Sequence, residues 1–107
     1  MDEKMISQPP VRTFAIISSG DPVGYVQQSV SAAAGLSSIP SDANKAIIQP
    51  ETGDIRYRDD GTAPTSSVGM YLFADNTLTI ESLAMLNAIQ LIAVSGTVTV
   101  NISYYKK

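Results

Sequence analysis

The sequence contains no cysteine, no histidine and no tryptophan. Without cysteine the chain has neither disulfides nor a thiolate nucleophile. Without histidine it lacks the commonest metal ligand and the commonest general base of enzymes. These absences exclude most familiar catalytic centres, so we expect no enzymatic activity and no cofactor.

Charge is also scarce. Charged residues make up 16% of the 107 residues, against roughly 25% in typical soluble domains. The formal net charge is −3 and the pI is about 4.6, so the chain lacks the clustered cations that bind nucleic acid or an anionic membrane. We therefore expect neither partner. A small domain with 44% apolar residues must cover its surface with uncharged polar groups or bury part of it against another protein.

The N-terminal residues contain no apolar stretch of signal-peptide length. No stretch of the chain approaches the roughly 18 apolar residues that span a bilayer. We therefore expect synthesis in the cytosol without a membrane anchor. Residues 1–11 are polar and end in Pro9 and Pro10, which predicts an extended N-terminal arm. Residues 12–107 are expected to form a single β domain.

Two interpretations of the arm stay open. It is either a frayed terminus or a segment that adds to a strand edge of a neighbouring subunit. In the second case pairing should fall on residues 3–7, and Met5 and Ile6 are the candidate interface residues because they are the large apolar side chains of that stretch.

Short apolar runs with strand-like alternation recur along the chain and are separated by turn residues. The predicted strands cover residues 13–18, 24–36, 46–49, 54–58, 68–73, 77–81, 88–94 and 97–105. About seven or eight strands at spacings of roughly 8–12 residues are typical of an antiparallel sandwich or barrel. The expected fold is all-β, either a small antiparallel β-sandwich or a jelly-roll-like barrel.

Three of these segments carry more specific expectations. Residues 24–36 alternate as a strand does, although their alanines would also suit a short helix. Residues 68–73 are apolar enough for a core strand. Residues 82–87 fit one helical turn with Ser82 as its N-cap.

The last two predicted strands flank Ser95–Gly96, a dipeptide typical of two-residue hairpin turns. We expect them to pair directly as a hairpin in the core of the sheet. In the final strand, alternation places one set of side chains on the core face, namely Val98, Val100, Ile102 and Tyr104.

Asp59 and Asp60 form the one adjacent acidic pair after the N-terminus. Adjacent strand residues point to opposite faces, so the two carboxylates should diverge instead of forming a catalytic dyad. The spacing also fails the alternating pattern of a calcium loop. A charged turn is the favoured interpretation. The serines and threonines of residues 62–67 have no histidine to activate them, and none of the four lysines has a sequence context that indicates burial.

Arg56, Tyr57 and Arg58 are candidate interface residues, because arginine and tyrosine are enriched in protein contacts. A nucleic-acid patch is disfavoured, since the acidic pair that follows would repel phosphate. The five tyrosines also raise a carbohydrate-binding alternative. The sequence shows no tryptophan and no nearby cluster of carboxylates and amides to support that alternative.

Two segments resemble parts of small bacteriophage and prophage virion proteins. One is Ile55-Arg56-Tyr57-Arg58-Asp59-Asp60-Gly61-Thr62-Ala63-Pro64-Thr65, continuing to Val68-Gly69, and the other is Gly96 to Tyr105. The group is similar to capsid decoration (cement) proteins and to minor head and tail components. The resemblance implies a virion location, no activity and no cofactor, and it assigns no site residues.

The combined expectation is a decoration protein that stabilises a phage head by packing against the major capsid protein or other virion subunits. A homotrimer is the favoured oligomer. The alternatives are a head–tail joining or tail-tip protein, and a carbohydrate-binding module for host attachment.

Overall fold

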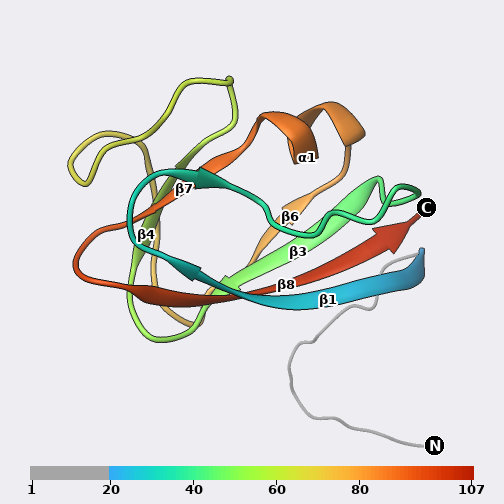
Figure 1. Cartoon of the computed structure of the whole chain (residues 1–107), viewed down its shortest axis with the longest axis horizontal. Helices are drawn as coiled ribbons and strands as arrows, with labels where there is room; N and C mark the ends of the chain where they lie inside the picture. The colour runs from blue at the N-terminus through green and yellow to red at the C-terminus, as the bar shows by residue number, and fades with distance from the viewer. Residues whose placement is uncertain (1–19) are drawn as a thin grey trace, which may run out of the picture.

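The computed structural model describes residues 20–107. The predicted arm, with Met5 and Ile6, and the predicted strand at residues 13–18 lie outside the described residues. The described chain forms eight strands and one short helix, arranged as two sheets that enclose a common core (Figure 1).

Each sheet has four antiparallel strands. The first has the order β1-β8-β3-β6, and the second has the order β2-β7-β4-β5. The strands of the first sheet are β1 (Asp21–Val30), β8 (Val98–Lys106), β3 (Lys45–Pro50) and β6 (Leu78–Ile80). The strands of the second sheet are β2 (Ala34–Gly35), β7 (Gln90–Ala93), β4 (Ile55–Arg58) and β5 (Met70–Leu72).

The chain crosses repeatedly between the sheets, and only β4 and β5 follow one another within one sheet. Eight strands in this order form a jelly roll, the double Greek-key sandwich found in viral capsid and lectin domains. The predicted all-β sandwich is therefore confirmed, with the topology of its jelly-roll form.

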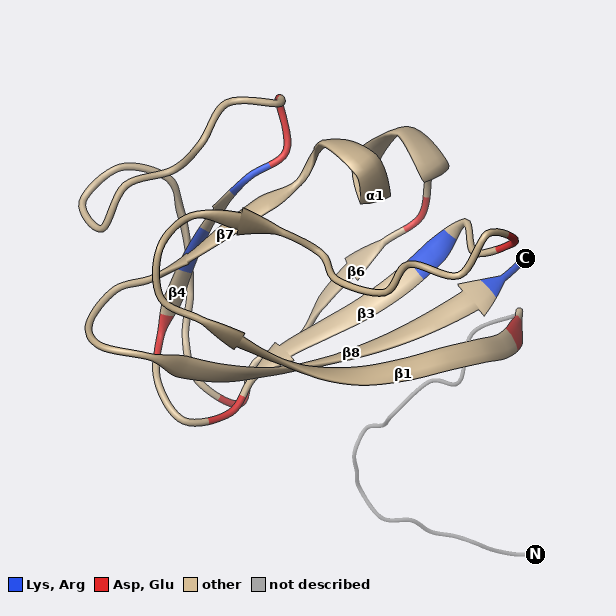
Figure 2. Cartoon of the chain, viewed as in Figure 1, with Lys and Arg blue, Asp and Glu red and all other residues tan. Residues whose placement is uncertain are grey.

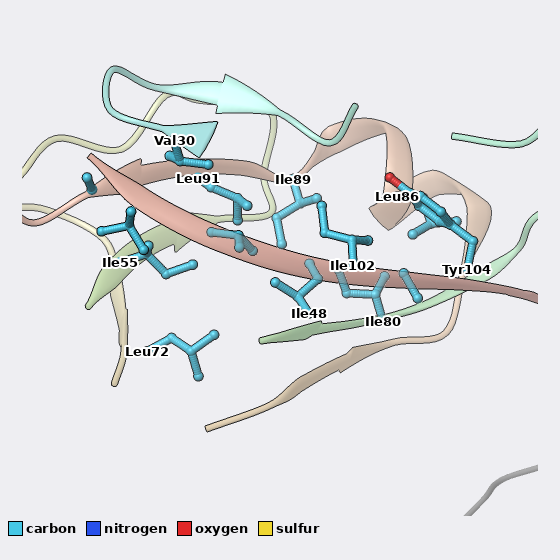
Figure 3. Close-up of a cluster of buried hydrophobic side chains, with 14 of the residues drawn as sticks. Val30, Ile48, Ile55, Leu72, Ile80, Leu86, Ile89, Leu91, Ile102 and Tyr104 are labelled. Carbon is cyan, nitrogen blue, oxygen red and sulfur yellow. The ribbon is translucent and has the colours of Figure 1, made fainter. Parts of the chain in front are cut away.

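The core lies between the sheets and contains aliphatic side chains from both (Figure 3). Ile48 and Ile102 of the first sheet, and Ile55 and Leu91 of the second, are fully buried. Burial of apolar area provides about 25 cal/mol per Å², so the two sheets are held against each other mainly by their inward-facing side chains.

β8 lies between β1 and β3. Its core face is the one predicted from alternation, because all four residues predicted to face inward are at most 1% exposed: Val98, Val100, Ile102 and Tyr104. Tyr104 also donates a hydrogen bond of 2.7 Å from its hydroxyl to the carbonyl of Ser37. This bond satisfies the one polar group that the ring takes into the core.

The predicted terminal hairpin is wrong. β8 pairs with β1 and β3, whereas β7 pairs with β2 and β4 in the other sheet. Ser95–Gly96 therefore lies on a connection between the sheets. Gly96 has a φ of +64°, so the residue type suits a tight turn, but the strands on either side diverge instead of pairing.

The prediction of a core strand at residues 68–73 is only partly correct. β5 forms there, but it lies at the edge of the second sheet, and only Leu72 is buried. Val68, Met70 and Phe73 are more than half exposed. An edge strand is covered on fewer sides than a central one, so apolar composition alone overestimated its burial.

The segment at residues 24–36, predicted as one strand, is divided by a bend into the end of β1 and the short β2, which belong to different sheets. β1 begins at Asp21, three residues before the predicted strand, and the register with β8 shifts between Pro22 and Gly24. Pro22 cannot donate to a strand ladder and is accommodated because β1 is an edge strand with an irregularity at that point.

The predicted helical turn is present as α1 (Leu83–Ala88). The Ser82 side chain accepts a hydrogen bond from the Met85 amide at 3.1 Å, as an N-cap does. α1 buries Leu86 at one end of the core. Within residues 20–107, no helix is long and apolar enough to cross a membrane.

Lys45 contradicts the expectation that no lysine is buried, because it is only 2% exposed. It faces Tyr105 across β3 and β8, with Nζ 5.8 Å from the ring centroid. Few other charges lie along the first sheet, where β1 and β8 carry charge only at one end (Figure 2).

Candidate functional site

Within residues 20–107, the largest group of exposed apolar side chains surrounds the edge strand β5. Val68, Met70, Tyr71 and Phe73 are 53%, 61%, 39% and 60% exposed. We call these four residues the β5 patch. Because side chains alternate along a strand, Tyr71 and Phe73 lie on one side of β5 and Met70 on the other. Their apolar surface therefore extends around the edge of the second sheet.

Two aromatic rings and an arginine form a cluster on the outer side of the patch. The Tyr71 and Phe73 ring centroids are 4.8 Å apart, with the planes inclined by 52°. Arg56 pairs with Tyr71 across β4 and β5, and its guanidinium carbon lies 4.9 Å from the Tyr71 ring centroid. This distance is within the range of a cation–π contact.

Arg56 also holds the loop that precedes β5. Its Nε donates to the Ser66 carbonyl at 3.2 Å, and its Nη1 donates to the Gly69 carbonyl at 2.8 Å. The predicted interface residue Arg56 therefore acts as a support that fixes both the loop and the Tyr71 ring.

Asp54 fixes the other end of Tyr71. Its carboxylate accepts hydrogen bonds from the Ala74 amide at 2.8 Å and from the Tyr71 hydroxyl at 2.7 Å. These two donors stabilise the ionised form, so they hold the pKa of Asp54 below its ordinary value, with the Ala74 amide as the larger cause. The rings of the patch are thus already held in place in the unbound protein.

Tyr57 lies apart from this cluster. It points to the core side of β4, opposite Met70 and Leu91, and packs against the buried cluster while partly exposed. The structure thus brings Arg56 and Arg58 to the outer face and directs Tyr57 inward, as the alternation of side chains along a strand requires.

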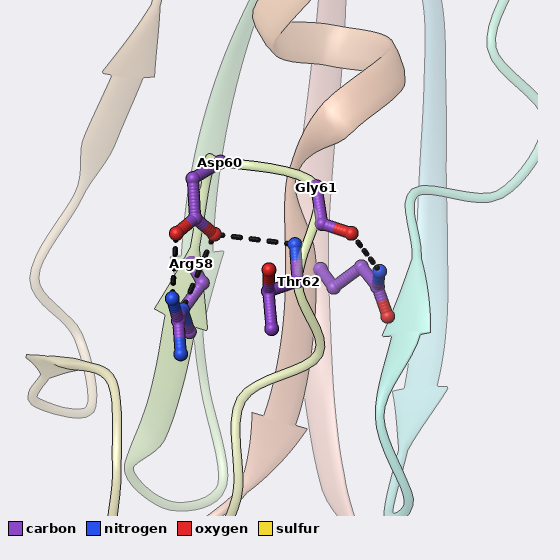
Figure 4. A network of polar contacts seen from close by, with 5 residues as sticks. Arg58, Asp60, Gly61 and Thr62 are labelled. Carbon is purple, nitrogen blue, oxygen red and sulfur yellow. Dashed lines mark hydrogen bonds and ion pairs between the residues drawn. The ribbon is translucent and has the colours of Figure 1, made fainter.

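Arg58 and Asp60 form a turn network (Figure 4). Arg58 donates to both Asp60 oxygens, at 3.2 Å from Nε and 2.6 Å from Nη2. Asp60 also accepts from the Thr62 amide at 3.2 Å. The bond with Arg58 is the largest cause that holds the pKa of Asp60 below its ordinary value. Asp60 therefore stabilises the charged turn that the sequence predicts, by accepting hydrogen bonds from Arg58 and Thr62.

A shallow pocket of about 250 Å³ opens beside this turn. It is lined by Arg58, Asp59, Asp60, Val68, Gly69 and Met70. The pocket is thus lined both by apolar side chains of the β5 patch and by charged residues of the turn. Within residues 20–107, no three acidic side chains are grouped so that they could hold a metal ion.

A second group of side chains was missed by the sequence analysis, which found no cluster of amides and carboxylates. On the outer face of the first sheet, Gln27, Asn101 and Gln49 lie opposite one another on β1, β8 and β3. Tyr25 and Glu51 complete the group by bonding to Asn101. We call these five residues the amide face.

Alternation had placed Asn101 on the polar side of its strand, but a single sequence does not reveal which residues of β1 and β3 lie beside it. Comparisons of the chain with protein-family models, with curated proteins and with solved structures give no match.

Proposed function

We propose that the protein acts by binding and not by catalysis, as a structural component of a bacteriophage particle that decorates and stabilises the head. The observation that carries this proposal is the β5 patch. Aromatic residues, methionine and arginine are the types enriched in protein interfaces, and the patch and its supports consist largely of them.

The geometry of the patch favours a stable contact. Arg56 and Asp54 already fix Tyr71 and the preceding loop, so few side chains need to be ordered on binding. Pre-organisation of this kind lowers the entropic cost of association. An exposed and anchored aromatic cluster is also where binding energy tends to concentrate in an interface.

The likeness of residues 55–69 and 96–105 to phage virion proteins supports the setting, and the jelly-roll order is one that viral capsid domains use. A subunit that binds only the assembled shell stabilises it by mass action. In this proposal the partner is the major capsid protein and the decorating unit is a homotrimer.

The test uses heads of the encoding phage prepared without this protein. Wild-type protein should sediment with the heads and raise their resistance to heat. Phe73→Ala and Met70→Ala should each weaken retention at least about tenfold, as loss of an interface anchor does.

Leu83→Ala is the matched control, because Leu83 is 51% exposed but lies on α1, away from the β5 patch. Equal retention of all variants would overturn the assignment of the patch. Binding to connector or tail fractions instead of heads would favour the head–tail joining or tail-tip alternative.

A further inference from the structure

The amide face is organised around Asn101. Its Oδ1 accepts from the Tyr25 hydroxyl at 2.7 Å and from Gln27 Nε2 at 3.0 Å. Its Nδ2 donates to Gln49 Oε1 at 3.3 Å and to Glu51 Oε1 at 2.9 Å. The full capacity of this amide, two acceptor positions and two donors, is used. Asn101 is therefore a positioning residue that fixes the four groups around it.

Some hydrogen-bonding capacity stays available on the surrounding groups. Gln27 Oε1 and the second carboxylate oxygen of Glu51 make no hydrogen bond within residues 20–107. Both residues are exposed. A ligand could therefore donate hydrogen bonds to these two oxygens and accept one from the remaining amide hydrogen of Gln27. Both groups are planar, and their bonds to Asn101 fix their orientation.

Tyr25 adds an apolar surface beside these groups. It is 63% exposed and lies directly opposite Ser103, but its hydroxyl reaches Asn101, two residues away along β8. The side chain must therefore lean along the sheet and not stand upright from it. Its hydroxyl and Gln27 Nε2 donate to the same oxygen of Asn101, so the exposed ring is held beside the Gln27 amide.

The surroundings of the face are nearly uncharged. The segments Pro22–Val30 and Val98–Tyr105 contain no charged residue, and the ribbons of β1 and β8 show charge only at one end (Figure 2). Glu51 is the one charge in the cluster. Among residues 20–107, none of the five residues of the amide face is a cation that could attract phosphate or sulfate, and Lys45 on the same side of β3 is buried, so the chemistry suits a neutral ligand.

We propose that the amide face binds a neutral saccharide. Such a ligand has hydroxyl groups that pair with fixed amides and carboxylates, and C–H faces that pack on an aromatic ring. The row of polar groups from β1 across β8 to β3 can contact successive units of an extended sugar chain. The binding site is separate from the β5 patch, because the two lie on different sheets, so one face can bind the particle while the other binds a glycan.

The test is affinity electrophoresis of the full chain in native gels containing dextran, mannan, galactan or a mixed-linkage β-glucan. At least one of these neutral polysaccharides should retard the wild-type protein. Tyr25→Ala and Gln27→Ala should each raise the apparent dissociation constant at least tenfold. Both side chains are exposed, and unchanged melting temperatures would show that the variants fold.

Ser29→Ala is the matched control, because Ser29 is an exposed residue on the same side of β1 and contributes no contact to the cluster. Phe73→Ala should bind the polysaccharide as the wild type does, even if it is lost from heads. Absence of retardation in all four gels, or equal retardation of wild type and Tyr25→Ala, would overturn the proposal. Stronger retardation by dextran sulfate than by dextran would overturn its neutral chemistry.

Discussion

Val100 and Thr99 are adjacent residues of β8 that point to opposite faces of the first sheet. Val100 is fully buried, whereas Thr99 is partly exposed. Replacing Val100 or Ile102 with alanine removes buried methyl groups and should lower the free energy of unfolding by on the order of 1–4 kcal/mol. Thr99→Ala should cost less than about 1 kcal/mol. Urea unfolding measures both, and equal losses at Thr99 and Val100 would contradict the register of β8.

Tyr104 gives a prediction that depends on pH. Burial raises its pKa from 10.0 to about 12, because the charged phenolate is poorly solvated inside the protein. A folded-state pKa above the unfolded value contributes stability that is fully present below pH 10 and is lost as the pH rises through 12. Tyr104→Phe should therefore make unfolding less sensitive to pH between 10 and 12.

The same substitution should lower stability at pH 7 by about 1 kcal/mol, since the Ser37 carbonyl loses its donor. Denaturant titrations at pH 7 and pH 11 separate the two effects. Tyr105→Phe, on the opposite face of β8, is the control. An unchanged alkaline loss in Tyr104→Phe would show that another group causes it.

At the scale of the elements, local patterns predicted most strands correctly. Alternation found the buried side of β8, and the serine preceding an apolar segment identified the N-cap of α1. These features depend on residues close together in the chain. Strand pairing instead depends on residues far apart in the chain. The Ser95–Gly96 turn therefore does not show which strands pair, because a tight turn can also lead from one sheet to the other.

The candidate site was predictable only in part for the same reason. Arg56 and Arg58 were identified by residue type, but Tyr71 and Phe73 of the β5 patch, which Arg56 supports, became relevant only through the β4–β5 register. The amide face contains residues from β1, β3 and β8. These strands are neighbours only because of the sheet topology, which no single segment of the sequence reveals.

The loop before β5 requires glycine at position 69. Gly69 has a φ of +141°, and a Cβ placed there would lie 3.1 Å from Pro64 Cβ and from the Tyr57 carbonyl oxygen. Gly69→Ala should therefore lower stability by roughly 1–3 kcal/mol and displace the carbonyl that Arg56 contacts.

Gly61→Ala is the comparison, because Gly61 also has a positive φ of +84° but a Cβ added there would have no other atom within 4 Å. It should cost less than Gly69→Ala in the same unfolding experiment. If the two losses were equal, backbone conformation alone, and not the crowding around Gly69, would account for them.

At the scale of the whole molecule, the topology sets the folding rate. β1 pairs with β8 from Asp21 opposite Lys106 to Val30 opposite Val98. The first described strand therefore cannot form its pairing until the last strand is in place. Folds dominated by such distant pairings fold in roughly milliseconds to seconds. Stopped-flow refolding should show this range, and microsecond folding would contradict a rate limited by the β1–β8 pairing.

The antiparallel pairing of β1 and β8 also determines how the domain responds to mechanical force. The start of β1 and the end of β8 lie side by side, because Asp21 is opposite Lys106. Tension applied between these two points would load the hydrogen bonds of the ladder one after another, as in opening a zipper, instead of shearing them together. The domain should therefore yield at low force when stretched between residues 21 and 106, and resist more strongly when pulled in a direction parallel to its strands.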